Sequence, residues 1–260
     1  MIAHNIRIVG HLLYRDLKVL AQNLLSRFID NIVVILVMTI LFGSLLPRMG
    51  MNASLIGPMI IGTLIQIGFH KGFTMSLIHL YDLAFNRCID YYITLPLPKK
   101  WVFTRYVISF MIEYSIIAIP LLLFGIILLS PSFTLIKTDI AALIIIYFLS
   151  SLFLALLFLY ISFAYSLEWV KANIWARRLS WLFLFSSTLF PFKPIAQAFP
   201  KLSYLFLISP LTYISEGLRS ALIGDNIFIP AWYCIGIVAT WNIILMYGLS
   251  YAATKKLDLI

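Results

Sequence analysis

One uninterrupted apolar run, IAALIIIYFLSSLFLALLFLYISFAY, occupies residues 140–165. A helix of about 20 apolar residues crosses the roughly 30 Å hydrocarbon core of a bilayer, so this run is long enough to span a membrane. A transmembrane barrel would instead show alternating segments of about ten residues. Because only helices and closed barrels satisfy their backbone hydrogen bonds in lipid, the run predicts a helical membrane protein.

The composition of the remaining chain extends this prediction. Hydrophobic residues make up 62% of the 260 positions, charged residues make up 11%, and the mean hydropathy is +1.01. These values exclude the balance of an ordinary soluble domain. We expect an all-α integral membrane protein whose residues 1–260 form a single transmembrane domain with six helices. The expected spans are Phe28–Leu46, Ser54–Phe73, Arg105–Leu129, Asp139–Tyr165, Ile174–Phe190 and Pro230–Ala253.

The positive charges predict the orientation of these spans. If both termini are cytoplasmic, most of the nineteen Lys and Arg residues fall on or near that side, as the positive-inside rule requires. The net charge of +9 then reflects topology and attraction to anionic lipid headgroups. Membrane lipid is therefore an expected partner, and nucleic acid is not. The exceptions are Arg48, Lys137, Lys193, Lys201 and Arg219.

Residues 1–27 show the period of an amphipathic helix. Such a helix lies in the membrane plane, with its apolar stripe in the acyl boundary and its basic face on the phosphates. It serves either as a lipid anchor or as a mechanical element, and the periodicity does not choose between them. The stripe consists of Ile2, Ile6, Val9, Leu13, Leu17, Leu20 and Leu24, and the opposite face of Arg7, His11, Arg15, Lys18 and Gln22.

The connection after the second expected span, residues 81–98, combines a short helix with a rigid corner. Its helix-compatible stretch runs to Thr94 and is stopped by Pro96 and Pro98, because proline cannot continue a helix. Two lysines follow where the chain returns to the membrane.

The connection before the last span, residues 191–229, is rich in proline yet strongly apolar. Non-helical backbone at membrane depth requires protein or a water-filled cavity to satisfy its polar groups. We therefore expect an external re-entrant hairpin of two short helices, about Ile195–Phe199 and Thr212–Leu222. In the second helix, Glu216 and Arg219 stand three residues apart on one face and can neutralise each other.

Two segments carry a resemblance to a known family. ISPLTYISEGLRSALIG, residues 208–224, resembles the segment before the last span in permease subunits of ATP-binding-cassette transporters of the type-2 exporter family. It retains Pro210 but has Ser209 where the family has Asn. The connection at 81–98 looks like the family's coupling segment, with Cys88 and Ile89 in place of its usual glycine. The residues that match or belong to that segment are Arg87, Asp90, Tyr91, Ile93, Leu95, Pro96 and Lys99.

The resemblance implies a transport conduit without its own motor. The chain has no Gly-x-x-x-x-Gly-Lys-Ser/Thr phosphate loop, so ATP and Mg²⁺ are expected on a separate ATPase subunit. Two permease copies and two ATPase subunits are implied, in the cell membrane and most naturally the bacterial inner membrane. ATP-driven closure of the ATPases would push on the coupling segment and open a path between the permeases. Drugs, lipids and glycans all remain candidate substrates.

An enzyme is the competing class, and the inventory of reactive residues does not favour it. His70 and His79 are nine residues apart without a carboxylate in zinc-binding spacing, and no Gly-x-Ser-x-Gly elbow is present. Cys88 and Cys234 fall on a cytoplasmic loop and inside the last span, so we expect no bridge between them. No metal site or catalytic residue is predicted.

One acidic residue keeps a second class of transporter open. Glu113 lies about two turns inside the third expected span, where a carboxylate is costly and commonly functional. It is either held by a partner such as Arg105, Ser109 or Tyr114, or it serves an ion-coupled secondary transporter.

Overall fold

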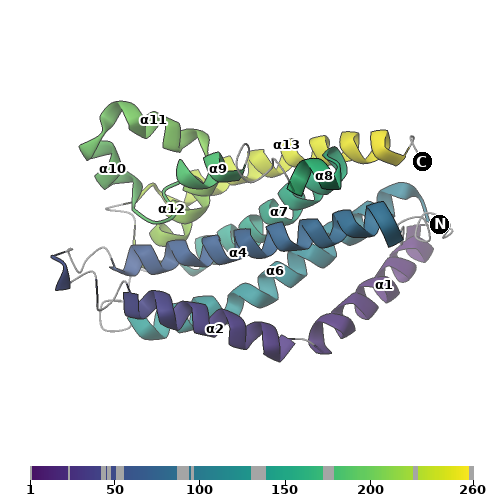
Figure 1. The fold of residues 1–260 in the computed structure, drawn as a ribbon, viewed down its shortest axis with the longest axis horizontal. Helices are drawn as coiled ribbons and strands as arrows, with labels where there is room; N and C mark the ends of the chain where they lie inside the picture. The colour runs from purple at the N-terminus through teal and green to yellow at the C-terminus, as the bar shows by residue number, and fades with distance from the viewer. Residues whose placement is uncertain are drawn as a thin grey trace.

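The computed structural model describes residues 2–22, 24–41, 45, 48–50, 56–86, 94, 97–129, 139–171, 179–224 and 228–257. Within these ranges the chain is helical or connecting and contains no strand, as the all-α prediction requires (Figure 1). The elements in chain order are α1 (Ile2–Gln22), α2 (Leu24–Ile40), α4 (Ile56–Tyr81), η3 (Asp82–Asn86), α6 (Lys99–Leu129), α7 (Ile140–Ala164), α8 (Leu167–Trp169), α9 (Ser180–Leu184), α10 (Phe192–Ala198), α11 (Pro200–Ile208), α12 (Pro210–Ile223) and α13 (Ala231–Leu257).

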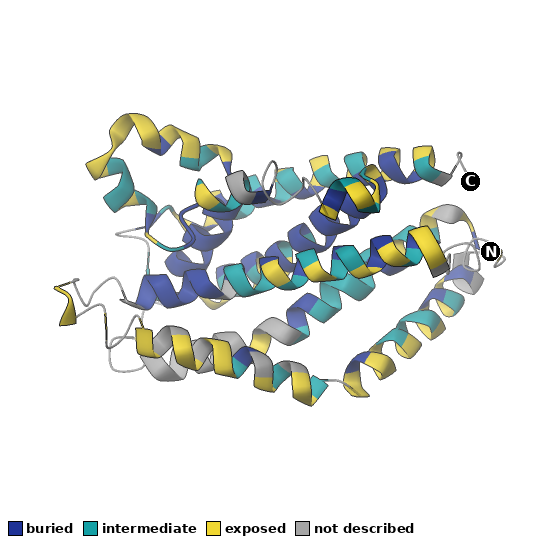
Figure 2. Cartoon of the chain, viewed as in Figure 1, coloured by how far each residue is buried: buried dark blue, intermediate teal, exposed yellow. Residues whose placement is uncertain are grey.

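Helix α7 is the central element of the bundle. Asp139 caps its first turn by accepting a 3.0 Å hydrogen bond from the Ala142 amide, which satisfies one orphan donor of the helix. The helix packs most extensively against α13 and also contacts α4, α6 and α12. Ile146 and Phe158 are fully buried, and Figure 2 shows the buried residues concentrated along α7 and α12. A run that is apolar on every face is thus covered by neighbours on most sides.

Two described helices are long and apolar enough to cross a membrane. They are α7 and α13, with mean hydropathies of 2.7 and 1.5 over their most apolar windows. The core helix of a soluble protein can have the same length and composition, so the six crossings and their orientation remain predictions.

The fifth expected span is wrong over its last third. Of Ile174–Phe190 the structure describes residues 179–190, in which α9 ends at Leu184 and the chain then turns through residues 185–190. The Ser186 hydroxyl donates to the Phe183 carbonyl over 2.6 Å. Hydroxyl groups that hydrogen-bond nearby backbone in this way compete with helix formation.

The described residues of the region 191–229 form three short helices instead of the two expected. Each begins at or directly after a proline: α10 after Pro191, α11 at Pro200 and α12 at Pro210. Proline suits the first helical turn because the amide it lacks has no intrahelical partner there. Helix α11, Pro200–Ile208, lies between the two helices that were expected.

Helix α1 lies against α6, and its apolar stripe is divided between two environments. Val9 and Leu20 are buried, whereas Ile6 is 55% and Leu17 is 36% exposed. Ile8 and Leu12, outside the predicted stripe, pack against the core around α6. The helix therefore contacts protein along one face and leaves part of its stripe exposed.

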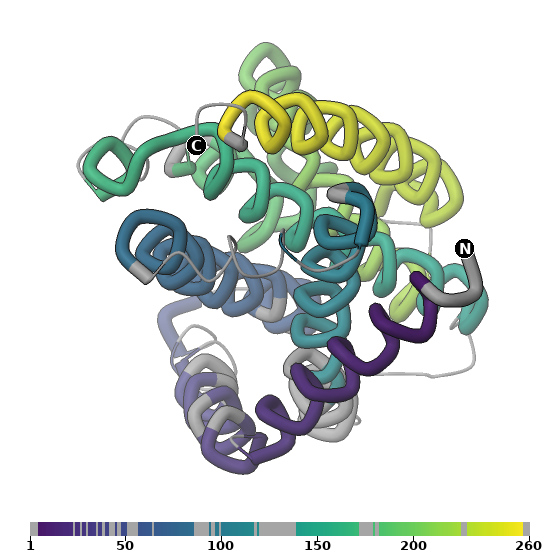
Figure 3. The backbone as a smooth tube through the Cα atoms, turned by 90° about the vertical axis from the view of Figure 1, so that its right-hand side faces the viewer, coloured from purple at the N-terminus to yellow at the C-terminus, as the bar shows by residue number. Residues whose placement is uncertain are grey.

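The bundle has two distinct ends. Both termini lie at one end, together with α1, and α10 and α11 lie at the other (Figure 1). Figure 3 views the bundle from the end that carries the termini.

Candidate functional site

The predicted coupling residues lie outside the part of the chain that the structure describes. They are Arg87, Asp90, Tyr91, Ile93, Leu95 and Pro96. The described elements on either side end at Asn86 and begin again, as a continuous helix, at Lys99. The segment thus joins η3 to α6.

The predicted hairpin residues come together on α12. Pro210 occupies the first turn of this helix, and Gly224 ends it with a φ of 112°, a backbone conformation that glycine adopts without a Cβ clash. Every residue from 210 to 222 is buried, although the helix is only moderately apolar. Its polar side chains must therefore find partners within the protein.

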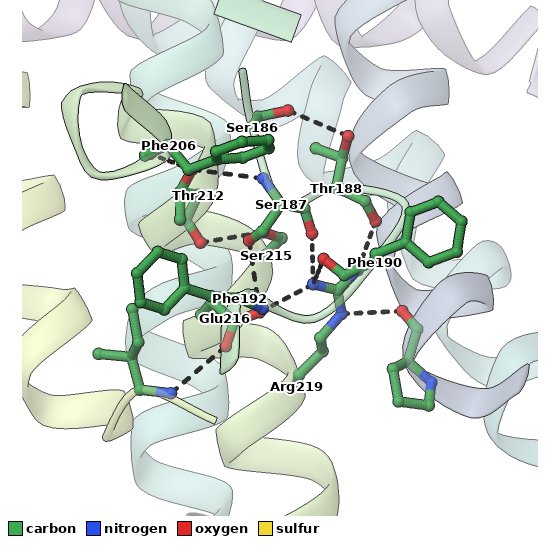
Figure 4. Close-up of polar contacts among 12 residues, drawn as sticks. Ser186, Ser187, Thr188, Phe190, Phe192, Phe206, Thr212, Ser215, Glu216 and Arg219 are labelled. Atoms are coloured by element: carbon green, nitrogen blue, oxygen red, sulfur yellow. Dashed lines mark hydrogen bonds and ion pairs between the residues drawn. The ribbon is translucent and has the colours of Figure 1, made fainter. Parts of the chain in front are cut away.

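Arg219 supplies most of these contacts. Its Nη1 lies 2.9 Å from Glu216 Oε1, so the predicted ion pair is present. Its Nε donates to the Pro58 carbonyl of α4 over 2.8 Å. The remaining guanidinium donors bind backbone carbonyls of the turn after α9 (Figure 4), namely those of Ser187, Thr188 and Phe190.

The carboxylate of Glu216 also accepts hydrogen bonds from other groups of the protein. Its Oε1 accepts from the Phe192 amide at 3.1 Å and from the Ser187 hydroxyl at 3.3 Å. Its Oε2 accepts from the Ile229 amide at 3.4 Å. Both side chains have 0% exposure. Because each charge also meets several dipoles, this buried pair avoids the uncompensated desolvation that destabilises isolated buried charges.

Hydroxyl groups complete the polar cluster. Ser187 and Ser215 are joined at 3.1 Å, Ser186 and Thr188 at 3.0 Å, and the Thr212 hydroxyl donates to the Phe206 carbonyl at 2.6 Å. These contacts satisfy the irregular backbone between α9 and α12 from within the protein (Figure 4), which is the condition for such backbone away from water.

A close approach of α4 fixes this cluster to the bundle. A Cβ on Gly62 would lie 1.4 Å from the Thr188 carbonyl oxygen and 2.7 Å from Arg219 Nη2. Only glycine therefore fits at this position. We define the polar lock as Glu216, Arg219, Ser187, Thr188 and their contacts on α4, Pro58 and Gly62.

Several parts of the polar lock escaped sequence reasoning. Pro58 and Gly62 precede Arg219 by more than 150 residues, and no local pattern links them to it. The signal for Ser186, Ser187 and Thr188 was present as three consecutive hydroxyl residues within an apolar run.

The polar lock holds segments together, and its charges are committed to protein groups. The guanidinium donors of Arg219 bind backbone carbonyls and Glu216, which leaves them poorly placed to recognise a charged substrate. Within the described ranges, no group of three or more His, Cys, Asp or Glu residues could hold a metal ion. The geometry thus fits a structural connection between the hairpin and α4.

A second ion pair lies at the opposite end. Asp16 Oδ2 of α1 accepts from Arg105 Nη2 at 2.6 Å, from Arg105 Nε at 2.9 Å and from the Ser109 hydroxyl at 3.3 Å. Arg105 and Ser109, two of the three expected partners of Glu113, bind Asp16. Glu113 itself is half-buried on α6. Asp16 was overlooked, although it is the only acidic residue before position 30.

Comparisons with protein-family models, with curated proteins and with solved structures found no match for this chain. Over the residues that it describes, the structure defines an all-helical protein in which two helices are long and apolar enough to cross a membrane.

Proposed function

We propose that this chain is the membrane-spanning permease subunit of an ATP-binding-cassette exporter, driven by a separate ATPase subunit. A second copy of the chain would complete the pathway, in a complex with two ATPase subunits. The proposal includes six membrane crossings, cytoplasmic termini and a location in the cell membrane, in bacteria the inner membrane.

The main support for the proposal is that α4 connects the two segments that resemble the transporter family. Together with η3 this helix runs from Pro58, which contacts Arg219, to Asn86, which directly precedes Arg87, the first of the predicted coupling residues. At 1.5 Å per residue this path is about 40 Å long. It would connect a push at the coupling segment with the hairpin at the far end of the bundle.

The other side of the coupling segment also leads into a mechanical connection. Helix α6 begins at Lys99, and Arg105 lies less than two turns further on, ion-paired to Asp16. Movement of the coupling segment would therefore reach α1 as well. This supports the mechanical interpretation of α1 over a simple lipid anchor.

Exposed apolar side chains on α2 support the membrane location. Leu25, Ile29 and Val33 follow at four-residue spacing and are 73%, 53% and 52% exposed. A soluble protein rarely leaves such a stripe in water, whereas a lipid-facing helix requires one.

A pull-down of the tagged chain from its native host in mild detergent tests the proposal. We expect a soluble ATPase with a phosphate-binding loop, in a two-plus-two complex. Asp90→Lys should release this ATPase, and Lys201→Gln on α11 should retain it. Recovery of the chain alone after crosslinking would contradict the proposal and favour the ion-coupled secondary transporter, for which Glu113→Gln should abolish transport.

A further inference from the structure

A cavity separate from the polar lock lies between the C-terminal ends of α7 and α13. Its volume is about 400 Å³, within the roughly 300–1,000 Å³ range of ligand pockets. Both helix ends belong to the end of the bundle that carries the termini (Figure 3). The polar lining comprises Tyr160, Tyr165, Ser166, Tyr251, Lys255 and Lys256.

Lys256 is held in place by the end of α7. Its Nζ donates to the Ser162 carbonyl at 2.8 Å and to the Tyr165 carbonyl at 3.3 Å. These contacts satisfy carbonyl groups that the helix end leaves unpaired. An ammonium group has three donors, so one remains for a ligand in the cavity.

Lys255 contributes a charge that the described residues do not neutralise. Its side chain is exposed and makes no hydrogen bond or ion pair within the described ranges. Two ammonium charges thus face two helix C-termini, each equivalent to about half a negative charge. The cavity keeps a net charge of about +1 and favours an anion.

The cavity wall also suits the chain of an amphiphile. Phe163, Ala164 and Ala252 line it beside the charged groups. The phenol groups of Tyr160 and Tyr251 add a polar edge of the kind found where helices meet the membrane surface. Basic pockets between transmembrane helices on the cytoplasmic side are known sites for anionic headgroups.

We propose that this cavity binds the phosphate group of an anionic membrane lipid, with Lys255 and Lys256 as its contacts. The lipid's glycerol region would lie against the apolar wall. The inference rests on the membrane location within the proposed function and is independent of the ATPase partner. It concerns a fixed lipid site and not the transported substrate.

Native mass spectrometry of the purified full chain in a neutral detergent tests the assignment. Phosphatidylglycerol is added in one arm, phosphatidylcholine in the second, and phosphatidylglycerol with excess inorganic phosphate in the third. We expect selective retention of phosphatidylglycerol that phosphate does not displace. Lys255→Gln should weaken retention about fivefold, which is the contribution of one lysine near an anionic lipid surface.

Matched variants separate a site from diffuse attraction. Lys201→Gln removes the same charge from an exposed position of α11 and should leave retention unchanged. Lys256→Arg should retain lipid better than Lys256→Gln, which also removes the cap of α7. Unchanged retention in Lys255→Gln, or an equal loss in Lys201→Gln, would overturn the inference.

Displacement by inorganic phosphate would assign the cavity to free phosphate and overturn the lipid assignment. The transporter proposal is judged by another result, the recovery of an ATPase. A chain that retains phosphatidylglycerol through Lys255 but recruits no ATPase would leave this inference standing and remove the other.

Discussion

Arg219 is the largest fully buried side chain among the described residues. Because it is charged, its burial is costly unless the guanidinium group is paired and hydrogen-bonded. Its guanidinium group is neutralised by Glu216 and joined to two segments distant in the sequence, α4 at Pro58 and the turn after α9 at Ser187. A buried ion pair adds little stability compared with a well-packed apolar pair. Its value here is to select one arrangement of the hairpin on α4.

Arg219→Leu should therefore destabilise the protein strongly, because Glu216 would remain buried without its partner. The expected loss is about 3–5 kcal/mol, measured as a lower unfolding midpoint in detergent. Lys201→Gln, which changes an exposed cation on α11, should stay within about 0.5 kcal/mol. An equal loss of stability in the two variants would show that the Glu216–Arg219 pair does not hold the hairpin on α4.

We expect the stability of the protein to depend on pH through His79, which lies at the other end of α4. It is buried among the rings of Tyr106, Phe110 and Phe163, six residues beyond the second expected span. Burial lowers the pKa of His79 from 6.5 to about 4; Asp82 opposes this shift, and Lys256 and Arg105 add to it. The folded protein keeps His79 neutral while the unfolded chain protonates it.

Stability should consequently fall as the pH drops from 6.5 to about 4. The contribution of His79 to this loss is about 3 kcal/mol, at about 1.4 kcal/mol per pKa unit. We expect His79→Phe to lose that much less stability across this interval in detergent unfolding curves. A matched change at the exposed His11 should leave the pH profile unaltered. Parallel profiles for wild type and His79→Phe would contradict the prediction.

At the scale of elements, the contact between α4 and the turn after α9 depends on Gly62. Gly62→Ala would make a methyl group overlap the Thr188 carbonyl group. Relieving this overlap requires a shift of the backbone, which costs more than a shift of a flexible side chain. The cost should reach or exceed the upper end of ordinary overpacking, about 3 kcal/mol. Gly236→Ala is the control, because its Cβ meets nothing within 4 Å.

Gly236→Ala should be neutral or stabilising by about 0.5–1 kcal/mol, since alanine favours an exposed helix interior more than glycine does. Thermal unfolding of both variants in the same detergent distinguishes them. Gly62→Ala with wild-type stability would show that α4 and the turn can separate at little cost.

The attachment of α1 to α6 depends on Asp16. Asp16→Ala leaves Arg105, which is 5% exposed, without its carboxylate, and should cost about 1.5–3 kcal/mol. Hydrogen exchange should rise across residues 2–22 while α7 stays protected. Arg15→Gln removes the exposed partner of the same carboxylate and should change exchange little. Unchanged hydrogen exchange in Asp16→Ala would show that the ion pair does not hold α1 on α6. The interpretation of α1 as a simple lipid anchor would then be favoured.

At the scale of the whole molecule, the two ends of the bundle should face opposite sides of the membrane. Cysteines introduced at Gly10 and Lys201, in a Cys88→Ser, Cys234→Ser background, provide the test. Only Lys201→Cys should react with a membrane-impermeant maleimide in right-side-out vesicles, and Gly10→Cys should react after inversion. Labelling of both from one side would contradict the topology.

Local patterns predicted the parts of the fold that neighbouring residues control. Helix α7 begins one residue after the expected Asp139 and ends one residue before Tyr165, because an apolar run between polar ends has few alternatives in lipid. The Glu216–Arg219 pair was predictable from local spacing as well, since residues three apart lie on one face of a helix.

Other features required contacts that no local pattern encodes. The turn after α9 lies within an expected span, and its path depends on Arg219, about 30 residues later. Asp16 and Arg105 are separated by 89 residues, and either could have faced water or lipid. Sequence alone was sufficient for the helical class and for the bounds of the central helix α7, because these follow from local energetics. The distant backbone groups that satisfy each buried charge could not be predicted in this way, because they depend on how the helices pack.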